Sequence, residues 1–201
     1  RIPAQPSATP SELLVAGGIP VAEVTFRAAR ADEAIAKKGA ALYYKEEIEP
    51  QREACRVAYI PIKSFAYPNC RRSDEADALF KQRGFAHVRG GHKGVAPYDP
   101  KGVKQEGLAP IHTVDRAFIP AEKAKGQFRL DTVIAGEAYH TDIEDILKCI
   151  RRAAERKEAF VLTSHGISPG AKGISMKTEW LERILSTAKE CGVRAVGFDE
   201  L

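Results

Sequence analysis

Strand-like and helix-like segments alternate along most of this chain, and this alternation constrains its fold more than any other feature. Such a pattern is typical of α/β domains with a parallel sheet. The predicted strands are short apolar runs at 21–26, 62–67, 85–88, 159–164 and 193–198, with 113–119 as a further candidate. Three helices are predicted at 31–38, at 44–57 with a bend near Pro50, and at 178–191. A short helix is also predicted between Thr9 and Gly17, another starts at Ser73, and a further one starts at the capping box Thr141-x-x-Glu144.

Length and charge narrow the possible classes of protein. With 201 residues, of which 44% are hydrophobic, the chain is long enough for one well-packed domain and short for two. Its 31 Lys and Arg exceed its 27 Asp and Glu by only four, and the charges are interspersed along helical faces, which argues against a nucleic-acid partner. No apolar run approaches the roughly 20 residues that span a bilayer, and no signal-like segment opens the chain, so we expect no transmembrane segment.

The four cysteines give no sign of a metal or redox motif. Cys55, Cys70, Cys149 and Cys191 are widely spaced and form no C-x-x-C pair. Cys149 and Cys191 lie on apolar faces of predicted helices, so buried free thiols are favoured over disulfides.

The run Phe160-Val-Leu-Thr-Ser-His165-Gly-Ile167 is the most informative about function. It places His165 where a buried strand passes into a Gly/Pro-rich loop, and in barrel-like α/β folds this end of the strand faces the active site. General acid or base catalysis suits such a histidine if another group orients its second ring nitrogen. A structural histidine that is hydrogen-bonded at a strand end is the alternative.

Other polar positions give weaker indications. The stretch Tyr67-Pro68-Asn69 sits at another strand end and predicts either a structural turn or the wall of a binding site. His87 and His92 flank a Gly-containing loop and could chelate a metal, although their spacing imposes no geometry. His112 and His140 flank loops and are predicted to be surface or capping residues. The Gly/Pro/Lys-rich segment from Gly90 to Pro110 is long enough to predict a functional or mobile loop.

From about residue 43 to 201 the chain resembles the polysaccharide deacetylases of the carbohydrate esterase type. Three stretches carry the resemblance: Tyr43-Tyr44-Lys-Glu-Glu-Ile-Glu-Pro50, Lys63-Ser-Phe-Ala-Tyr-Pro-Asn-Cys70, and Val161-Leu-Thr-Ser-His-Gly-Ile167 continuing to Leu201. The resemblance implies a distorted (β/α) barrel and hydrolysis of the amide C–N bond of N-acetylated sugars, with His165 as the acid that protonates the leaving amine. It also implies substrate contacts at Tyr67, Pro68, Asn69 and Ser164, and an extracytoplasmic location.

The family's metal-binding motifs are not found in this chain. Relatives hold a divalent metal such as zinc with an Asp and two His, but the nearest segment, Val24-Thr25-Phe26-Arg27, lacks the aspartates. Ala66 also replaces the arginine that is common in the third motif. Metal-assisted hydrolysis needs ligands that lower the pKa of bound water, so the activity is expected to be impaired unless His87, His92 or His140 supply them. The other route is a metal-free reaction, as in allantoinase-like relatives of the fold.

Residues 11–35 resemble the early barrel segment of 2-keto-3-deoxy-6-phosphogluconate aldolase. The run Val21-Ala-Glu-Val-Thr-Phe-Arg27 carries this likeness, which implies proton transfer by Glu23 and anion binding by Arg27. No later strand offers a Schiff-base lysine, and covalent aldol chemistry requires one.

The two resemblances meet near residues 36–42, so the chain reads as a chimeric single barrel, with 1–38 aldolase-like and 43–201 deacetylase-like. Recombined barrel fragments, a natural fusion, a designed chimera or an irregular sequence record would each produce this junction. The leading hypothesis is a deacetylase-like hydrolase acting on a carbohydrate substrate. The alternatives are a catalytically silent carbohydrate-binding or scaffold barrel and, less favoured, an aldolase-type lyase.

Overall fold

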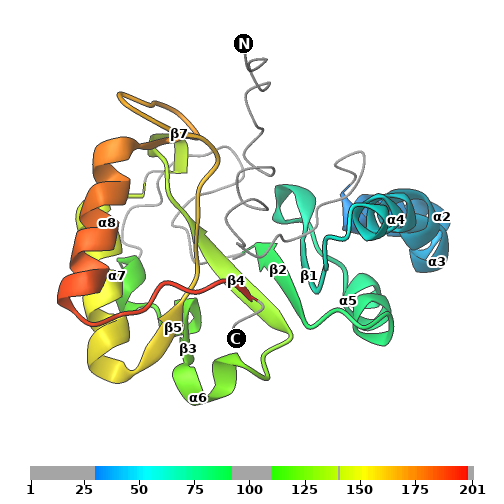
Figure 1. The fold of residues 1–201 in the computed structure, drawn as a ribbon, viewed down its shortest axis with the longest axis horizontal. Coiled ribbons are helices and arrows are strands. Elements are labelled where there is room, and N and C mark those ends of the chain that lie inside the picture. The colour runs from blue at the N-terminus through cyan, green and yellow to red at the C-terminus, as the bar shows by residue number, and fades with distance from the viewer. Residues whose placement is uncertain (1–29, 92–109, 140, 199–201) are drawn as a thin grey trace, which may run out of the picture. The chain divides into compact units, whose positions relative to one another are not determined.

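A computed structural model describes residues 30–91, 110–139 and 141–198 (Figure 1). The predicted strand 21–26, the helix after Thr9 and most of the loop after Gly90 lie outside these residues. The chain divides into two compact units, one formed by residues 1–90 and 197–201 and the other by residues 91–196. Each is described by itself below, and the single barrel domain stays a prediction.

The first unit begins with a series of short helices. They are α2 (Ala31–Lys38), α3 (Ala40–Tyr43), a π-helical turn (Tyr44–Ile48) and α4 (Glu49–Val57). Gly39, with φ of 79°, separates α2 from α3. Pro50 falls in the first turn of α4, directly after the π-helical turn. The predicted helices at 31–38 and 44–57 are therefore confirmed, and a π-helical turn ends at Ile48, two residues before the Pro50 position where a bend was expected.

Two parallel strands complete this unit. Strand β1 (Ser64–Ala66) pairs with β2 (His87–Gly91), and α5 (Asp74–Gln82) connects them. The Ser73 hydroxyl accepts a hydrogen bond from the Glu75 amide at 3.2 Å, which explains why α5 begins where the sequence predicts. Phe65 and Phe80 lie with their ring centroids 4.5 Å apart in a core of aromatic side chains.

The second unit contains the longer helices. In chain order its elements are two 3-10 turns (Ile111–Thr113 and Asp115–Ala117), β3 (Phe118–Pro120), α6 (Ala121–Ala124), β4 (Arg129–Ile134), a 3-10 turn η5 (Glu137–Tyr139), α7 (Ile143–Arg156), β5 (Glu158–Phe160), β6 (Leu162–Thr163), β7 (Ile167–Ser168), β8 (Met176–Lys177) and α8 (Thr178–Glu190). Strands β4 and β6 pair in parallel, and α7 lies between them in the sequence. Strand β7 pairs in parallel with β8, and β3 pairs antiparallel with β5.

Helices α7 and α8 pack side by side, as Figure 1 shows, and share one apolar core. Ile146 and Ile150 of α7 and Ile184 of α8 are buried in it, as their helical spacing predicts. The apolar spacing in 178–191 also predicts Leu185 on this buried face, but Leu185 is 51% exposed. Its position one residue beyond Ile184 turns it about 100° away from the core.

Arg152 joins three elements of the second unit. Its guanidinium donates to the Glu158 carboxylate at 2.9 and 3.1 Å, to the His112 carbonyl at 3.0 Å and to Asp115 at 2.8 Å. It also lies 3.9 Å from the centroid of the Phe118 ring. A buried arginine is tolerated here because its donors meet these acceptors and its charge is balanced.

Several sequence-based predictions need correction. The run 159–164 is divided between β5 and β6, because its first half pairs with β3 and its second half with β4. Only the end of 113–119 is a strand, and the described part of 193–198 contains none. Asp142, not Thr141, caps α7 by accepting from the Glu144 amide at 2.8 Å, since the Thr141 hydroxyl donates to the Ile134 carbonyl at 2.7 Å.

Parallel strand pairs joined by helices make this an α/β protein, as the sequence predicts. In the described part of the chain, no helix combines the length and apolar character needed to cross a membrane. All four cysteines are free in the structure. Cys149 is buried, as predicted, but Cys191 is only partly covered, so the prediction of burial was wrong for that thiol.

Candidate active site

His165 lies two residues beyond the carboxyl end of β6. The neighbouring parallel strand β4 ends at the same edge, where Ile134 is in register with Thr163. The loops that follow β4 and β6 therefore leave the sheet together, and ligands of parallel α/β sheets bind at such carboxyl edges. The predicted strand-end position of His165 is confirmed.

Tyr139 contacts His165 from the loop that follows β4. The Tyr139 hydroxyl and Nε2 of His165 are 2.7 Å apart, and the two rings stack with centroids separated by 5.9 Å. Tyr139 is half-buried, while His165 is exposed. A hydrogen bond and a stacked ring restrict the rotation of the imidazole while one edge stays open to a substrate.

The segment Gly173–Lys177 holds both loops in place. The Gly173 carbonyl accepts a hydrogen bond from the Ala138 amide at 2.8 Å, and the Met176 amide donates to the Gly166 carbonyl at the same distance. One bond fixes the residue before Tyr139 and the other fixes the residue after His165. The tyrosine–histidine pair is therefore positioned by a third part of the chain.

An ion pair adds to this support. Lys177 Nζ lies 2.7 Å from Glu137 Oε1, which connects β8 to η5. The hydrogen bond to Lys177 lowers the pKa of Glu137, and the same bond raises the pKa of Lys177. Both groups therefore keep their charges at neutral pH.

Gly136 allows the close approach of these segments. A Cβ atom at this position would lie 2.9 Å from the Ile174 carbonyl oxygen, and the residue has φ of 155°. A side chain would therefore meet backbone that cannot easily move, so the turn after β4 requires glycine.

The arrangement can transfer a proton. A protonated imidazole carries a hydrogen on each ring nitrogen, so His165 can donate Nε2–H to Tyr139 and still offer Nδ1–H to a leaving group. The expected substrate contact Ser164 precedes His165, but its hydroxyl donates to the Gly166 carbonyl at 3.5 Å.

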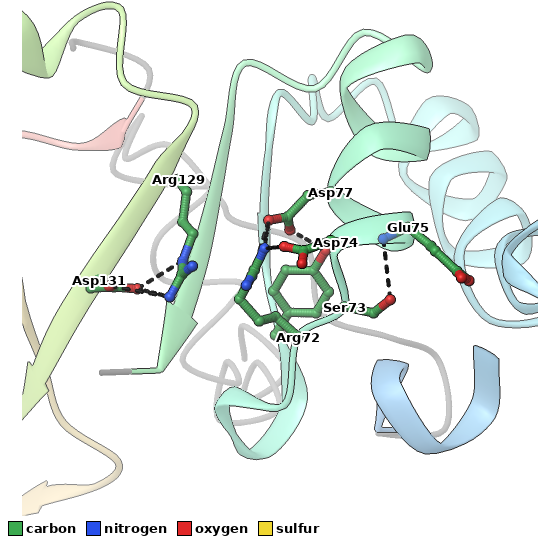
Figure 2. Close-up of polar contacts among 8 residues, drawn as sticks. Arg72, Ser73, Asp74, Glu75, Asp77, Arg129 and Asp131 are labelled. Carbon is green, nitrogen blue, oxygen red and sulfur yellow. Dashed lines mark hydrogen bonds and ion pairs between the residues drawn. The ribbon is translucent and has the colours of Figure 1, made fainter. Parts of the chain in front are cut away.

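Tyr67 was one of the residues for which the sequence allowed either a structural turn or the wall of a binding site. Its side chain is fully buried, and its hydroxyl donates to Asp77 at 2.7 Å. Arg72 donates to the other oxygen of Asp77 at 2.6 and 3.0 Å, and it also pairs with Asp74 (Figure 2). Burial, followed by the bond to Asp77, raises the pKa of Tyr67. These contacts support the structural-turn interpretation, and contact with substrate stays a prediction.

The contacts described for the other predicted site residues do not connect them to His165. Pro68 is buried, whereas Asn69 is exposed and has φ of 51°. His87 is 4% exposed within β2, and His92 and His140 lie outside the described residues. His112 is half-buried and pairs through Nδ1 with Asp145, which also accepts from the Ile111 amide at 2.8 Å.

The described residues show no ligand set for the implied divalent metal. Within ranges 30–91, 110–139 and 141–198, no three His, Cys, Asp or Glu side chains form a group that could hold a metal ion. The metal therefore stays an expectation from the family resemblance, and no catalytic step is derived through it.

Tyr139 is the site residue that the sequence did not reveal. It follows β4, which was not predicted because Arg129 and Asp131 interrupt the apolar run. These two residues share one face of the strand, where the guanidinium donates to the carboxylate at 3.1 and 3.3 Å (Figure 2). The alternation of the buried residues Leu130 and Thr132 with Arg129 and Asp131 was the sequence signal for strand β4.

Comparison with known proteins gives no relative: no protein family, curated protein or solved structure matches this chain.

Proposed function

We propose that this protein is a polysaccharide-deacetylase-like hydrolase that cleaves the amide C–N bond of N-acetylated sugars. The observation that carries the proposal is the position of His165, at the carboxyl edge of two parallel strands and hydrogen-bonded to Tyr139. The sequence resemblance gives the reaction class, and a distorted (β/α) barrel is the architecture that belongs with it.

In this proposal His165 is the general acid. Amide cleavage releases an amine, which is a poor leaving group until it is protonated. His165 supplies that proton from Nδ1, while Nε2 stays hydrogen-bonded to the Tyr139 hydroxyl. Tyr139 is then a positioning residue, since it acts on the substrate through the imidazole.

An exposed imidazole is compatible with a polymeric substrate. A polysaccharide chain must reach the acid without being enclosed, and His165 lies at the surface of the second unit. The following residues Ile167–Gly170 are exposed as well, so the loop offers an open approach to the sugar.

Acetate release from N-acetylated oligosaccharides tests the reaction. Purified full-length protein is assayed with added zinc or cobalt, and with chelator as the control. Release with metal that chelator abolishes supports the metal-dependent form, and release that chelator leaves unchanged supports the metal-free form. No release by folded protein would overturn the proposal and favour the silent barrel.

A further inference from the structure

A second place suited to a ligand lies in the first unit, whose elements do not include those that carry His165. It is a cavity of about 700 Å³ beside α4. Its lining combines charged side chains, one tyrosine and the apolar segment Ile60–Ile62. The charged residues and the tyrosine are Tyr44, Glu49, Arg52, Glu53, Arg56 and Arg83.

Two of these arginines are held by aromatic rings. The Arg52 guanidinium lies 4.7 Å from the centroid of Phe85 and donates to the Tyr44 hydroxyl at 2.8 Å. The Arg83 guanidinium lies 4.8 Å from the centroid of the Tyr44 ring. Tyr44 is only 3% exposed, so a buried ring fixes both cationic groups at the cavity.

The charge of these two guanidiniums is not balanced by carboxylates. Arg56, in the same cavity, pairs with Glu53 at 2.6 Å. Among the described residues, neither Arg52 nor Arg83 forms an ion pair, although Glu49 and Glu53 also line the cavity and Glu53 is engaged by Arg56. Arg52 also donates to the Arg83 carbonyl at 3.3 Å, which shows how near the two residues are.

We propose that this cavity binds a small molecule through an oxyanion, namely a phosphate, sulfate or carboxylate group, held by Arg52 and Arg83. A guanidinium presents parallel N–H donors that match the oxygens of such groups. Within the described residues, Arg52 uses only Nη1 for the Tyr44 hydroxyl and the Arg83 carbonyl, which leaves Nε and Nη2 for a ligand. The wall at Ile60–Ile62 contacts the apolar part of the ligand. This inference is independent of the proposed deacetylase activity.

The test is a titration of full-length protein with inorganic phosphate, sulfate and glucuronate, followed by NMR or calorimetry at constant ionic strength. Constant ionic strength separates specific binding from screening. Wild type is compared with Arg52→Gln and Arg83→Gln, and with Arg183→Gln as a matched control. Arg183 is an exposed arginine on α8 that pairs with Glu144 in the other unit.

Saturable binding of at least one anion by wild type is expected, together with at least tenfold weaker binding in Arg52→Gln and Arg83→Gln and unchanged binding in Arg183→Gln. The anion that binds most tightly identifies the group recognised. If Arg52→Gln fails to fold, the exposed Arg83 decides the matter through its own variant. Absence of saturable binding in wild type, or equal binding by Arg83→Gln and Arg183→Gln, would overturn the proposal.

Discussion

At the scale of single residues, the environment of a side chain decides what it can do. His165 and His112 both meet an oxygen, but His165 is exposed beside a neutral hydroxyl, whereas His112 is half-buried against the Asp145 carboxylate. In the proposed function, the first gives a proton to a substrate. The second shares Asp145 with the Ile111 amide and so fixes the start of a turn.

Replacing Tyr139 with phenylalanine tests its positioning role. The variant keeps the stacked ring and loses the hydrogen bond to Nε2. Loss of one such bond costs about 1 kcal/mol, so kcat for acetate release should fall about fivefold with little change in KM. The ¹⁵N shifts of the His165 imidazole should also report an altered tautomer balance. Tyr59→Phe is the control, because that side chain is 94% exposed, and equal effects of the two variants would contradict the role.

Cys149 predicts a loss of stability at alkaline pH. Burial, followed by the nearby Asp145 charge, raises the pKa of this thiol from 9.0 to about 12. Because the folded pKa is the higher one, the contribution is complete below pH 9 and declines as the pH rises towards 12. Each pH unit in this window removes about 1.4 kcal/mol of unfolding free energy through this group.

Urea unfolding of wild type and Cys149→Ala at several pH values between these limits checks this prediction. The tyrosines with raised pKa values, Tyr43 and Tyr67, contribute equally to both proteins. Wild type should therefore lose stability more steeply than the variant. Parallel pH profiles would show that Cys149 is not responsible.

At the scale of elements, local signals predicted helices better than strands. The cap at Ser73 and the apolar spacing in α7 act within one helix, so α5 and α7 lie close to the predicted positions. Strand boundaries depend on partners that are distant in sequence. For this reason the run 159–164 forms two strands, of which β5 pairs with β3 and β6 pairs with β4. The strand expected at 193–198 shows the same limit, because an apolar run becomes a strand only if it finds a partner.

The turn between β4 and η5 should tolerate no side chain at Gly136. In Gly136→Ala the new Cβ meets the Ile174 carbonyl oxygen at 2.9 Å, and the positive φ adds strain. We expect a loss of about 1–3 kcal/mol in unfolding free energy, measured by urea denaturation. Gly126→Ala is the matched control, because its Cβ would lie 3.9 Å from the nearest atom, the Lys123 carbonyl oxygen. Similar stabilities of the two variants would rule out the close approach as the reason for glycine.

At the scale of the whole molecule, the alternation of strands and helices predicted the α/β class, and the end of one apolar run predicted the position of His165. The partner of His165 could not be predicted. Tyr139 reaches it through the pairing of β4 with β6, through the bond from the Ala138 amide to the Gly173 carbonyl and through the bond from the Met176 amide to the Gly166 carbonyl. The guanidiniums of Arg52 and Arg83 were also not predicted. Residues 52 and 83 come from different helical segments, and only folding brings them to one cavity.

The role of His165 as general acid is tested most directly by comparing two substrates in wild type and His165→Gln. N-acetylated oligosaccharides release an amine that needs a proton, whereas p-nitrophenyl acetate releases a phenolate that does not. If His165 is the acid, the variant should lose about 10²- to 10⁴-fold in amide hydrolysis and retain most of its activity on the aryl ester. Equal loss on both substrates, or no loss on either, would contradict the role of His165 as the acid.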